Sequence, residues 1–331
     1  MTTMSSTDAW LAASGGDAPA GLAALRGRGR DVFAAAGFPP TRHEDWKYTN
    51  LAELARGVFA PARAGAPAPL PAAAAPLGGV RLAFVDGVFA PASGSAAALP
   101  EGAFAGRLRD ALAADGDGVA AALGSCVDLE AHPLAALNTA HLADAAVVLV
   151  PRGVVLEAPV EIVFHAAAAQ PTVAHPRVLV VLGEGARATV VERFLGSDGT
   201  ASFTNAVSEA VLGRGAALTH VRVQEESDAA WHVGGLWARQ AADSRLQSSV
   251  VSLGGRVART DVAVVLDGRG AECDLDGLYV ARGRQHVDHH TAIDHRSPQA
   301  TSRELYKGVL DDAATGVFNG KVFVRPDAQK S

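Results

Sequence analysis

Short β-rich runs fill the second half of this chain, and they constrain its fold more than any other feature. From about residue 145 onward, runs of apolar and β-branched residues alternate with turns that contain Gly or Asp. Several runs end in a leucine followed by Gly or Asp: Leu182, Leu212, Leu253, Leu266 and Leu310. These leucines stand near multiples of about 14 residues apart, a length that suits one strand plus one turn. The repeat predicts a stacked β-solenoid whose coils bury their apolar faces against one another.

A β-sandwich is the competing fold, because it also uses many short strands. Hairpin signals are scarce after residue 150, which favours the solenoid. Alternation within the run 219–224 predicts which side chains face the core. Thr219, Val221 and Val223 are expected inside, and His220, Arg222 and Gln224 outside.

Composition narrows the class of protein. The chain has 331 residues, of which 49% are hydrophobic and 5% aromatic, and a net charge of −6. This is enough apolar material for a large core, and a weakly acidic chain is a poor nucleic-acid binder. Two cysteines exclude a disulfide framework. The first 20 residues lack a basic segment and the apolar runs are short, so we expect a cytoplasmic protein without a membrane span.

The first part of the chain, residues 1–143, reads as a helical and mixed domain, and residues 144–331 as the solenoid. Helical patterns cover residues 21–36, 104–123 and 133–142. Residues 80–89 predict a hairpin with Asp86-Gly87 at its turn. Residues 60–79, rich in Pro and Ala, read as an extended linker.

Histidines cluster near the end of the chain, at His286, His289, His290 and His295. On a strand, His286, Asp288 and His290 would share one face, with His289 opposite. Imidazole and carboxylate suit zinc or iron, and Cys273 stands about one coil earlier, so these histidines and Cys273 form a tentative metal site. The alternatives are a solvent-facing polar strip for the histidines and buried, inert thiols for the cysteines.

A resemblance extends along nearly the whole chain. Five segments occur in order along the sequence: RHEDWKYT at residues 42–49, LNTA at 137–140, DHHT at 288–291, LYKGVL at 305–310 and FNGKV at 318–322. In this order they resemble the SufB/SufD family of iron–sulfur cluster assembly proteins, and the N-terminal segment is closer to the SufD branch. The signature residues are Arg42, Glu44, Trp46, Lys47, Tyr48, Tyr306, Lys307, Asn319 and Gly320. Without the resemblance, Trp46 and Tyr48 would be read as packing the helical domain.

The resemblance implies a right-handed parallel β-helix and a non-catalytic scaffold subunit. Its expected partners are homologues of SufB and SufC, and it implies no contact with nucleic acid or membrane. It also implies that no cofactor is bound tightly by this chain alone. A nascent iron–sulfur cluster is expected at the interface of the complex.

Two departures from the family pattern qualify this expectation. Gln299-Ala300-Thr301 stand where many members carry a cysteine, and the sequence stops at Ser331 before the family's later coils and C-terminal helical tail. The chain is therefore expected to be C-terminally truncated. An uncapped coil around residues 317–324 should then associate with other chains.

Two other functions remain open from the residues alone. A β-helix enzyme acting on carbohydrate would need clustered carboxylates in a groove. The candidates by proximity are Asp261, Asp267, Glu272, Asp274 and Asp276. The histidine cluster could instead make the chain a metal-binding module.

Overall fold

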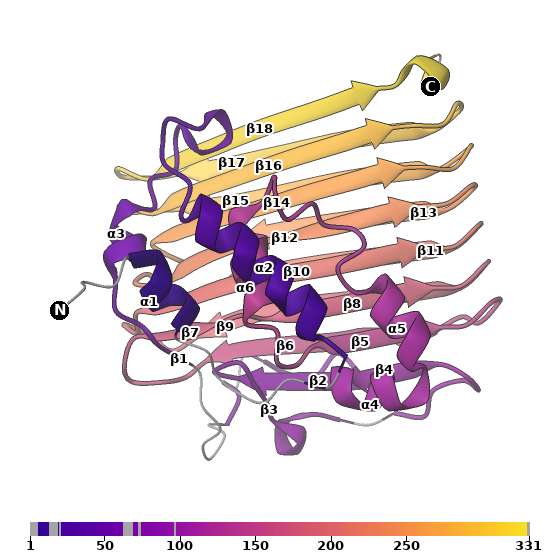
Figure 1. Ribbon diagram of the computed structural model, residues 1–331, viewed down its shortest axis with the longest axis horizontal. Coiled ribbons are helices and arrows are strands. Elements are labelled where there is room, and N and C mark those ends of the chain that lie inside the picture. The colour runs from indigo at the N-terminus through magenta and orange to yellow at the C-terminus, as the bar shows by residue number, and fades with distance from the viewer. Residues whose placement is uncertain are drawn as a thin grey trace.

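The computed structural model describes residues 6–12, 19, 21–61, 69–71, 74–95 and 97–329. It is a β-solenoid with a helical layer on one side (Figure 1). Successive strands alternate between two sheets, and within each sheet nearly all neighbouring strands run parallel. The predicted solenoid is confirmed, and the β-sandwich is not the fold.

From β8 onward, the even-numbered strands lie in sheet A and the odd-numbered strands lie in sheet B, whereas the earlier strands do not follow this rule. The strands of sheet A are β4 (Phe104–Arg107), β5 (Ala146–Val150), β8 (Arg177–Leu182), β10 (Ser202–Leu212), β12 (Trp231–Gln240), β14 (Val257–Leu266), β16 (His286–His295) and β18 (Thr315–Val324), joined by β1 (Ala60–Pro61) and β7 (Thr172–Ala174). Those of sheet B are β2 (Val80–Val85), β3 (Val88–Phe89), β6 (Val160–Ala166), β9 (Arg187–Gly196), β11 (Ala217–Glu225), β13 (Arg245–Ser252), β15 (Glu272–Ala281) and β17 (Thr301–Leu310).

Strand register explains the period in the sequence. Val257 pairs with His286, and His286 pairs with Thr315, so one full coil is about twice the sequence period. Each coil contributes one strand to each sheet, and each sequence repeat is half a coil.

The predicted orientation of residues 219–224 is wrong. His220, Arg222 and Gln224 are buried between the two sheets, whereas the alternate residues of β11 are only half-buried on its outer side. The polar groups are tolerated inside because they are paired. Arg222 Nη2 donates to Glu192 at 2.8 Å, and His220 Nε2 lies 3.1 Å from the same carboxylate. Burial opposes the charge of Glu192, but Arg222 and His220 outweigh it and lower its pKa to about 2.

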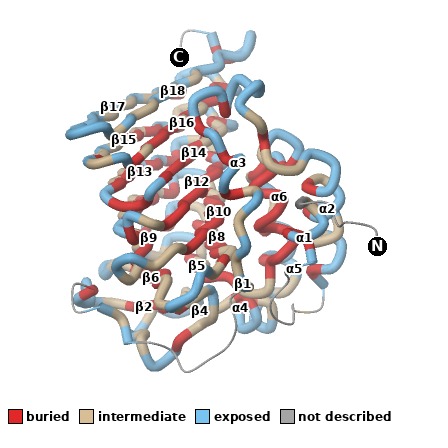
Figure 2. Tube along the Cα trace, turned by 90° about the vertical axis from the view of Figure 1, so that its left-hand side faces the viewer, coloured by how far each residue is buried: buried red, intermediate tan, exposed pale blue. Residues whose placement is uncertain are grey.

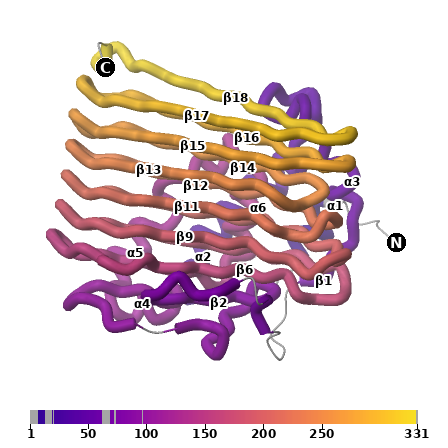
Figure 3. The backbone as a smooth tube through the Cα atoms, turned by 180° about the vertical axis from the view of Figure 1, so that it is seen from behind, coloured from indigo at the N-terminus to yellow at the C-terminus, as the bar shows by residue number. Residues whose placement is uncertain are grey.

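Helices from the first part of the chain cover the outer face of sheet A (Figures 1 and 2). They are α1 (Ser6–Ala12), α2 (Ala23–Ala36), α3 (Ala52–Arg56), α4 (Leu108–Ala114), α5 (Gly116–Ala122) and α6 (Pro133–Ala140), with short 3₁₀ turns at Glu44–Trp46, Pro91–Ser93 and Pro326–Ala328. Trp10, Phe33 and Trp46 pack with Phe203 and Trp237 of sheet A in one apolar cluster. Viewed from behind, the outer face of sheet B is not covered by any of the described helices (Figure 3).

The local predictions for the first part of the chain mostly hold. Helices α2 and α6 lie within the predicted ranges, but residues 104–107 form strand β4 before the helices begin. The hairpin forms between β2 and β3, and Asp86 and Gly87 adopt φ of 49° and 79° at its turn. Part of the predicted linker lies outside the described residues. Within the described part, Leu70 and Ala74 pack on Val163 and Leu195 of sheet B.

Candidate functional site

Strand β16 divides the histidine cluster between two faces, as its alternation predicts. His286 and His290 point to the outer side of sheet A, where the helical layer lies, and His289 and His295 point into the solenoid. The four imidazoles therefore do not share one site.

The two inward histidines have separate protein partners. His289 Nε2 lies 3.2 Å from Ser252 Oγ, and its ring stacks on Tyr279 with centroids 5.5 Å apart. Burial lowers the pKa of His289 to about 4, so the imidazole is neutral at pH 7. His295 Nε2 lies 2.9 Å from Ser302 Oγ.

Cys273 is on β15 beside Ser302 in the sheet B register, on the inner side of the solenoid. It belongs to the aliphatic core, and burial raises the pKa of its thiol. Cys126 is partly buried, and burial, followed by the charge of Glu209, raises its pKa to about 11. Burial thus disfavours the thiolate of both residues, and the thiolate is the form of cysteine that binds metal.

The outward histidines meet the N-terminal signature. Residues 45–53, which we call the clasp, lie across the outer face of β14, β16 and β18 (Figure 1). Thr49 Oγ1 lies 2.8 Å from His286 Nε2 and donates a hydrogen bond to Asp288. His290 Nε2 lies 3.0 Å from the other oxygen of Asp288.

Arg259 of β14 is at the centre of this contact. Its guanidinium stacks on Trp46 at 3.8 Å, and it donates to the Asp45 carbonyl at 2.5 Å and to Asp288 at 3.0 Å. A further bond of 2.9 Å goes to Asp261. Burial opposes the charge, but the two carboxylates outweigh it and raise the pKa of Arg259.

Two ion pairs hold the ends of the clasp. Lys321 of β18 pairs with Asp45, and Arg256 makes a two-pronged pair with Glu53, at 2.6 Å for each bond. The clasp therefore connects residues that are more than 200 positions apart in the sequence.

The outward row does not suit a metal ion. This row consists of His286, Asp288 and His290, whose polar atoms contact Thr49, Arg259 and one another. The guanidinium of Arg259 supplies the positive charge that balances the carboxylate of Asp288. The described residues contain no group of three or more His, Cys, Asp or Glu side chains that could hold a metal ion.

The other signature residues divide between inside and outside. Trp46 is buried in the clasp, but Tyr48 is 64% exposed and does not pack the helical domain as predicted. Arg42, Glu44 and Lys47 are also exposed. The Tyr306 ring faces inward and stacks on Phe318 with centroids 4.8 Å apart.

Near the end of the stack, Lys307 is exposed on the outer side of sheet B. In β18, Asn319 pairs with His290 on the outer side, and Gly320 lies above the inward-facing Thr291.

The LNTA segment, residues 137–140, makes a second buried contact with the solenoid. Asn138 Nδ2 donates to the carbonyls of Pro176 and Asn205, both at 2.8 Å. Arg177 donates to Asn138 at 3.1 Å and pairs with Glu209 at 2.5 Å, and the side chains of this ion pair are fully buried. This contact attaches α6 to β8 and β10.

The carboxylates considered for carbohydrate chemistry do not form a groove. Asp261 lies under the clasp, whereas Asp274 and Asp276 face Arg303 on sheet B. Asp267 and Glu272 are also paired with arginines. Each of these carboxylates thus has an arginine partner that compensates its charge.

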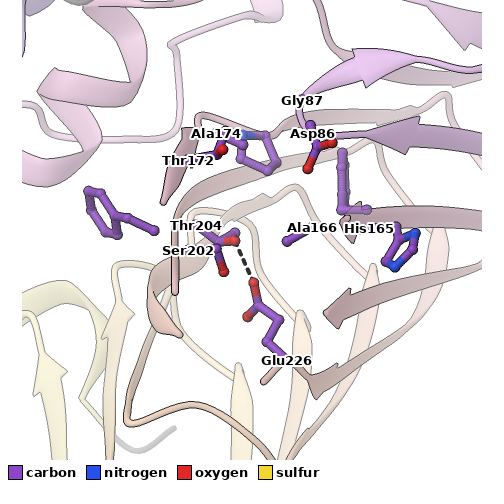
Figure 4. A pocket seen from close by; sticks show the side chains of 12 residues that line it. Asp86, Gly87, His165, Ala166, Thr172, Ala174, Ser202, Thr204 and Glu226 are labelled. Carbon is purple, nitrogen blue, oxygen red and sulfur yellow. Dashed lines mark hydrogen bonds between the residues drawn. The ribbon is translucent and has the colours of Figure 1, made fainter. Parts of the chain in front are cut away.

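A small pocket opens beside the β2–β3 hairpin, at a corner of the solenoid (Figure 4). Glu226, which accepts a hydrogen bond from Thr204, lies on one side, and Asp86 and His165 lie on the other. Its volume of about 20 Å³ has room for about one water molecule. A sugar ring does not fit in it.

Arg259, Arg256 and Lys321 were not identified from the sequence. All three are far in sequence from residues 45–53, although Lys321 belongs to the FNGKV segment, and the strand register places Arg259 and Lys321 on the two strands of sheet A that flank β16. The spacing of Arg259, Asp261, Asp288 and His290 on two paired strands could have indicated a polar row on one face. The sequence contains nothing that pairs this row with residues 45–53.

No described helix is long and apolar enough to cross a membrane. Comparisons with known proteins match the chain along most of its length. The family model described as "SufBD protein N-terminal region" matches residues 74–162, and the one described as "SUF system FeS cluster assembly, SufBD core domain" matches residues 164–331.

Three relatives give the extent of the similarity. The iron–sulfur cluster assembly protein SufD of Escherichia coli is 30% identical over 300 residues, which cover 89% of this chain and 68% of SufD. A SufBD family protein of Synechocystis is 28% identical over 314 residues, covering 90% of this chain and 68% of the relative. The chloroplastic protein ABCI7 of Arabidopsis thaliana is 30% identical over 203 residues, covering 59% and 43%. With both family models matched in order on a β-solenoid, the chain belongs to the SufBD family of iron–sulfur cluster assembly proteins.

Proposed function

We propose that this chain is a SufD-like scaffold subunit without catalytic activity of its own. It assembles in the cytoplasm with homologues of SufB and SufC. The observation that carries the proposal is the similarity to Escherichia coli SufD over 89% of the chain. The Synechocystis relative, named as an assembly protein of the same family, supports it over a similar extent.

The nascent iron–sulfur cluster is the cargo of this complex, and we propose that it forms at an interface with a partner. Two features of the chain support this division of labour. Both thiols have raised pKa values, and the outward histidine row is engaged by Arg259 and Thr49. A chain arranged in this way contributes surface and shape rather than a complete ligand set.

Co-expression tests the proposal. The chain, carrying an affinity tag, is produced with the SufB and SufC homologues of its own organism and analysed by size-exclusion chromatography with light scattering. We expect a complex that contains all three chains. Recovery of the tagged chain alone, with both partners expressed and soluble, would contradict the proposal.

Anaerobic reconstitution with ferrous iron and sulfide tests where the cluster resides. The chain alone is expected to retain far less than one cluster per molecule after desalting, while the complex retains it. The double variant Cys126→Ala/Cys273→Ala should leave the content of the complex unchanged. A stoichiometric cluster on the isolated chain that this variant abolishes would overturn the assignment.

A further inference from the structure

We infer that the outer face of sheet B docks a Pro- and Ala-rich segment of a partner protein that carries a carboxylate. The docking surface, which we call the sheet B patch, lies on the later coils. It consists of Leu253, Leu278, Val280, Leu305 and Val309. It is separate from the clasp, which lies against sheet A, and it goes beyond the scaffold role proposed above.

The sheet B patch exposes large apolar side chains on a flat face. Leu278 and Val280 are 40% and 41% exposed, and Leu305 and Val309 are 46% and 57% exposed. None of the helices that the structure describes lies in front of these strands (Figure 3). A shallow hollow runs through the patch between Val251, Leu278 and Leu305. Contiguous apolar surface of this kind is typical of an interaction site.

The chain itself shows what kind of segment fits this face. Leu70 and Ala74, which belong to the Pro- and Ala-rich stretch, pack on Val163 of β6 and Leu195 of β9. The described residues 69–71 and 74–77 form neither helix nor strand. The amide of Ala74 donates to the Pro71 carbonyl at 2.8 Å, so the segment turns at this point. At the first coils, the outer face of sheet B therefore already contacts an apolar segment that is rich in Pro and Ala.

The strand register carries the same two rows of side chains into the patch. The row of Val163 continues through Arg193, Val223 and Val251 to Leu278, and the row of Leu195 continues through Glu225 to Leu253 and Val280. The ion pair between Arg193 and Glu225 separates the surface that Leu70 and Ala74 cover from the exposed sheet B patch.

The charged side chains around the sheet B patch indicate which charge the docked segment carries. Arg303 is compensated by Asp274 at 3.2 Å and by Asp276 at 3.9 Å. Lys307, which follows Leu278 in the same row, has no acidic partner among the residues that the structure describes. A carboxylate on the docked segment would pair with Lys307 at the edge of an apolar contact, a position where charge adds specificity.

The test uses a fluorescein-labelled peptide with the sequence of residues 69–77 followed by one glutamate, titrated with the whole chain and followed by fluorescence anisotropy. We expect saturable binding that weakens about tenfold or more in Leu278→Ser, because the leucine loses its apolar contact. Lys307→Glu should weaken binding as well. A second peptide that ends in lysine should recover binding to Lys307→Glu.

Matched controls come from the opposite side of the molecule. Val58 is 90% exposed and Lys47 is exposed, and both lie in the N-terminal layer. Val58→Ser and Lys47→Glu should bind the first peptide as the parent does. Absence of saturable binding would overturn the proposal, and so would binding that Leu278→Ser and Lys307→Glu leave unchanged.

Discussion

Arg259 shows how a single buried charge organises the contact between the clasp and the later strands of sheet A. It contacts Trp46, Asp45, Asp261 and Asp288, and its side chain is 3% exposed. A guanidinium can stack on a ring and bond several oxygens in one plane, which a lysine ammonium cannot do. The signature at residues 42–49 is therefore in part a binding site for this arginine.

Replacing Arg259 by methionine should reduce the free energy of unfolding by about 3 kcal/mol, because it leaves the buried Asp288 without its cation. Urea unfolding followed by circular dichroism measures this. The control is Arg245→Met, which breaks an exposed pair with Glu272 and should cost at most about 1 kcal/mol. Equal effects of the two variants would show that the buried arrangement contributes nothing special.

His141 gives a second prediction at the scale of the residue, on pH. Burial, assisted by nearby Arg30 and Arg26, lowers its pKa to about 4, and its Nε2 lies 2.9 Å from the Trp10 carbonyl. An unfolded histidine titrates near 6.5, so the unfolded state binds the extra proton between these values. The stabilisation is complete above about pH 6.5 and is lost as the pH falls toward 4.

Urea midpoints at pH 7.5 and pH 5 check this expectation. The decrease between the two pH values should be smaller in His141→Gln, which keeps a donor for the Trp10 carbonyl. His43, which is exposed, supplies the control His43→Gln with the decrease of the parent. A parent-like decrease in His141→Gln would refute the assignment.

At the scale of the element, the clasp stabilises strands that are distant in sequence. It lies over the outer face of β14, β16 and β18, and its buried residue is Trp46. Long-range contacts of this kind close the first part of the chain onto the last coils. The late strands should therefore depend on the clasp for their protection from solvent.

Hydrogen exchange followed by mass spectrometry tests this dependence. Trp46→Ala removes the ring under Arg259 and should speed amide exchange in β16 and β18 by more than in β6 and β9. Tyr48→Ala, at an exposed neighbour in the same segment, should leave all four strands unchanged. A uniform effect of Trp46→Ala on every strand would mean general destabilisation rather than a clasp.

The elements also show what the sequence can predict. The repeat identified the solenoid and the alternation of β16 separated His289 from His290, because both depend only on local periodicity. The predicted orientation of β11 was wrong, because an alternation of Val and polar residues has the same sequence pattern whichever of its two faces is buried. Only the partners, such as Glu192 for Arg222, decide it. The role of Arg259 was missed because it too depends on partners that are distant in the sequence, Trp46 and Asp45.

For the whole molecule, the two sheets leave β17 and β18 as their last strands in the described chain. Their backbones offer unpaired groups, and Val322 and Val324 are 54% and 53% exposed. Exposed edge strands with apolar side chains pair with other chains. We therefore expect a polypeptide of residues 1–331 to self-associate through the exposed edges of β17 and β18.

Light scattering as a function of protein concentration measures this association. Val322→Lys/Val324→Lys places charges on the edge and should shift the protein toward the monomer, because edge lysines oppose strand pairing. Val58→Lys adds one charge at a 90% exposed site in the N-terminal layer and should leave the association unchanged. A parent protein that is monomeric at every concentration would contradict the prediction. Equal dissociation by Val58→Lys would show that net charge, rather than the edge, controls association.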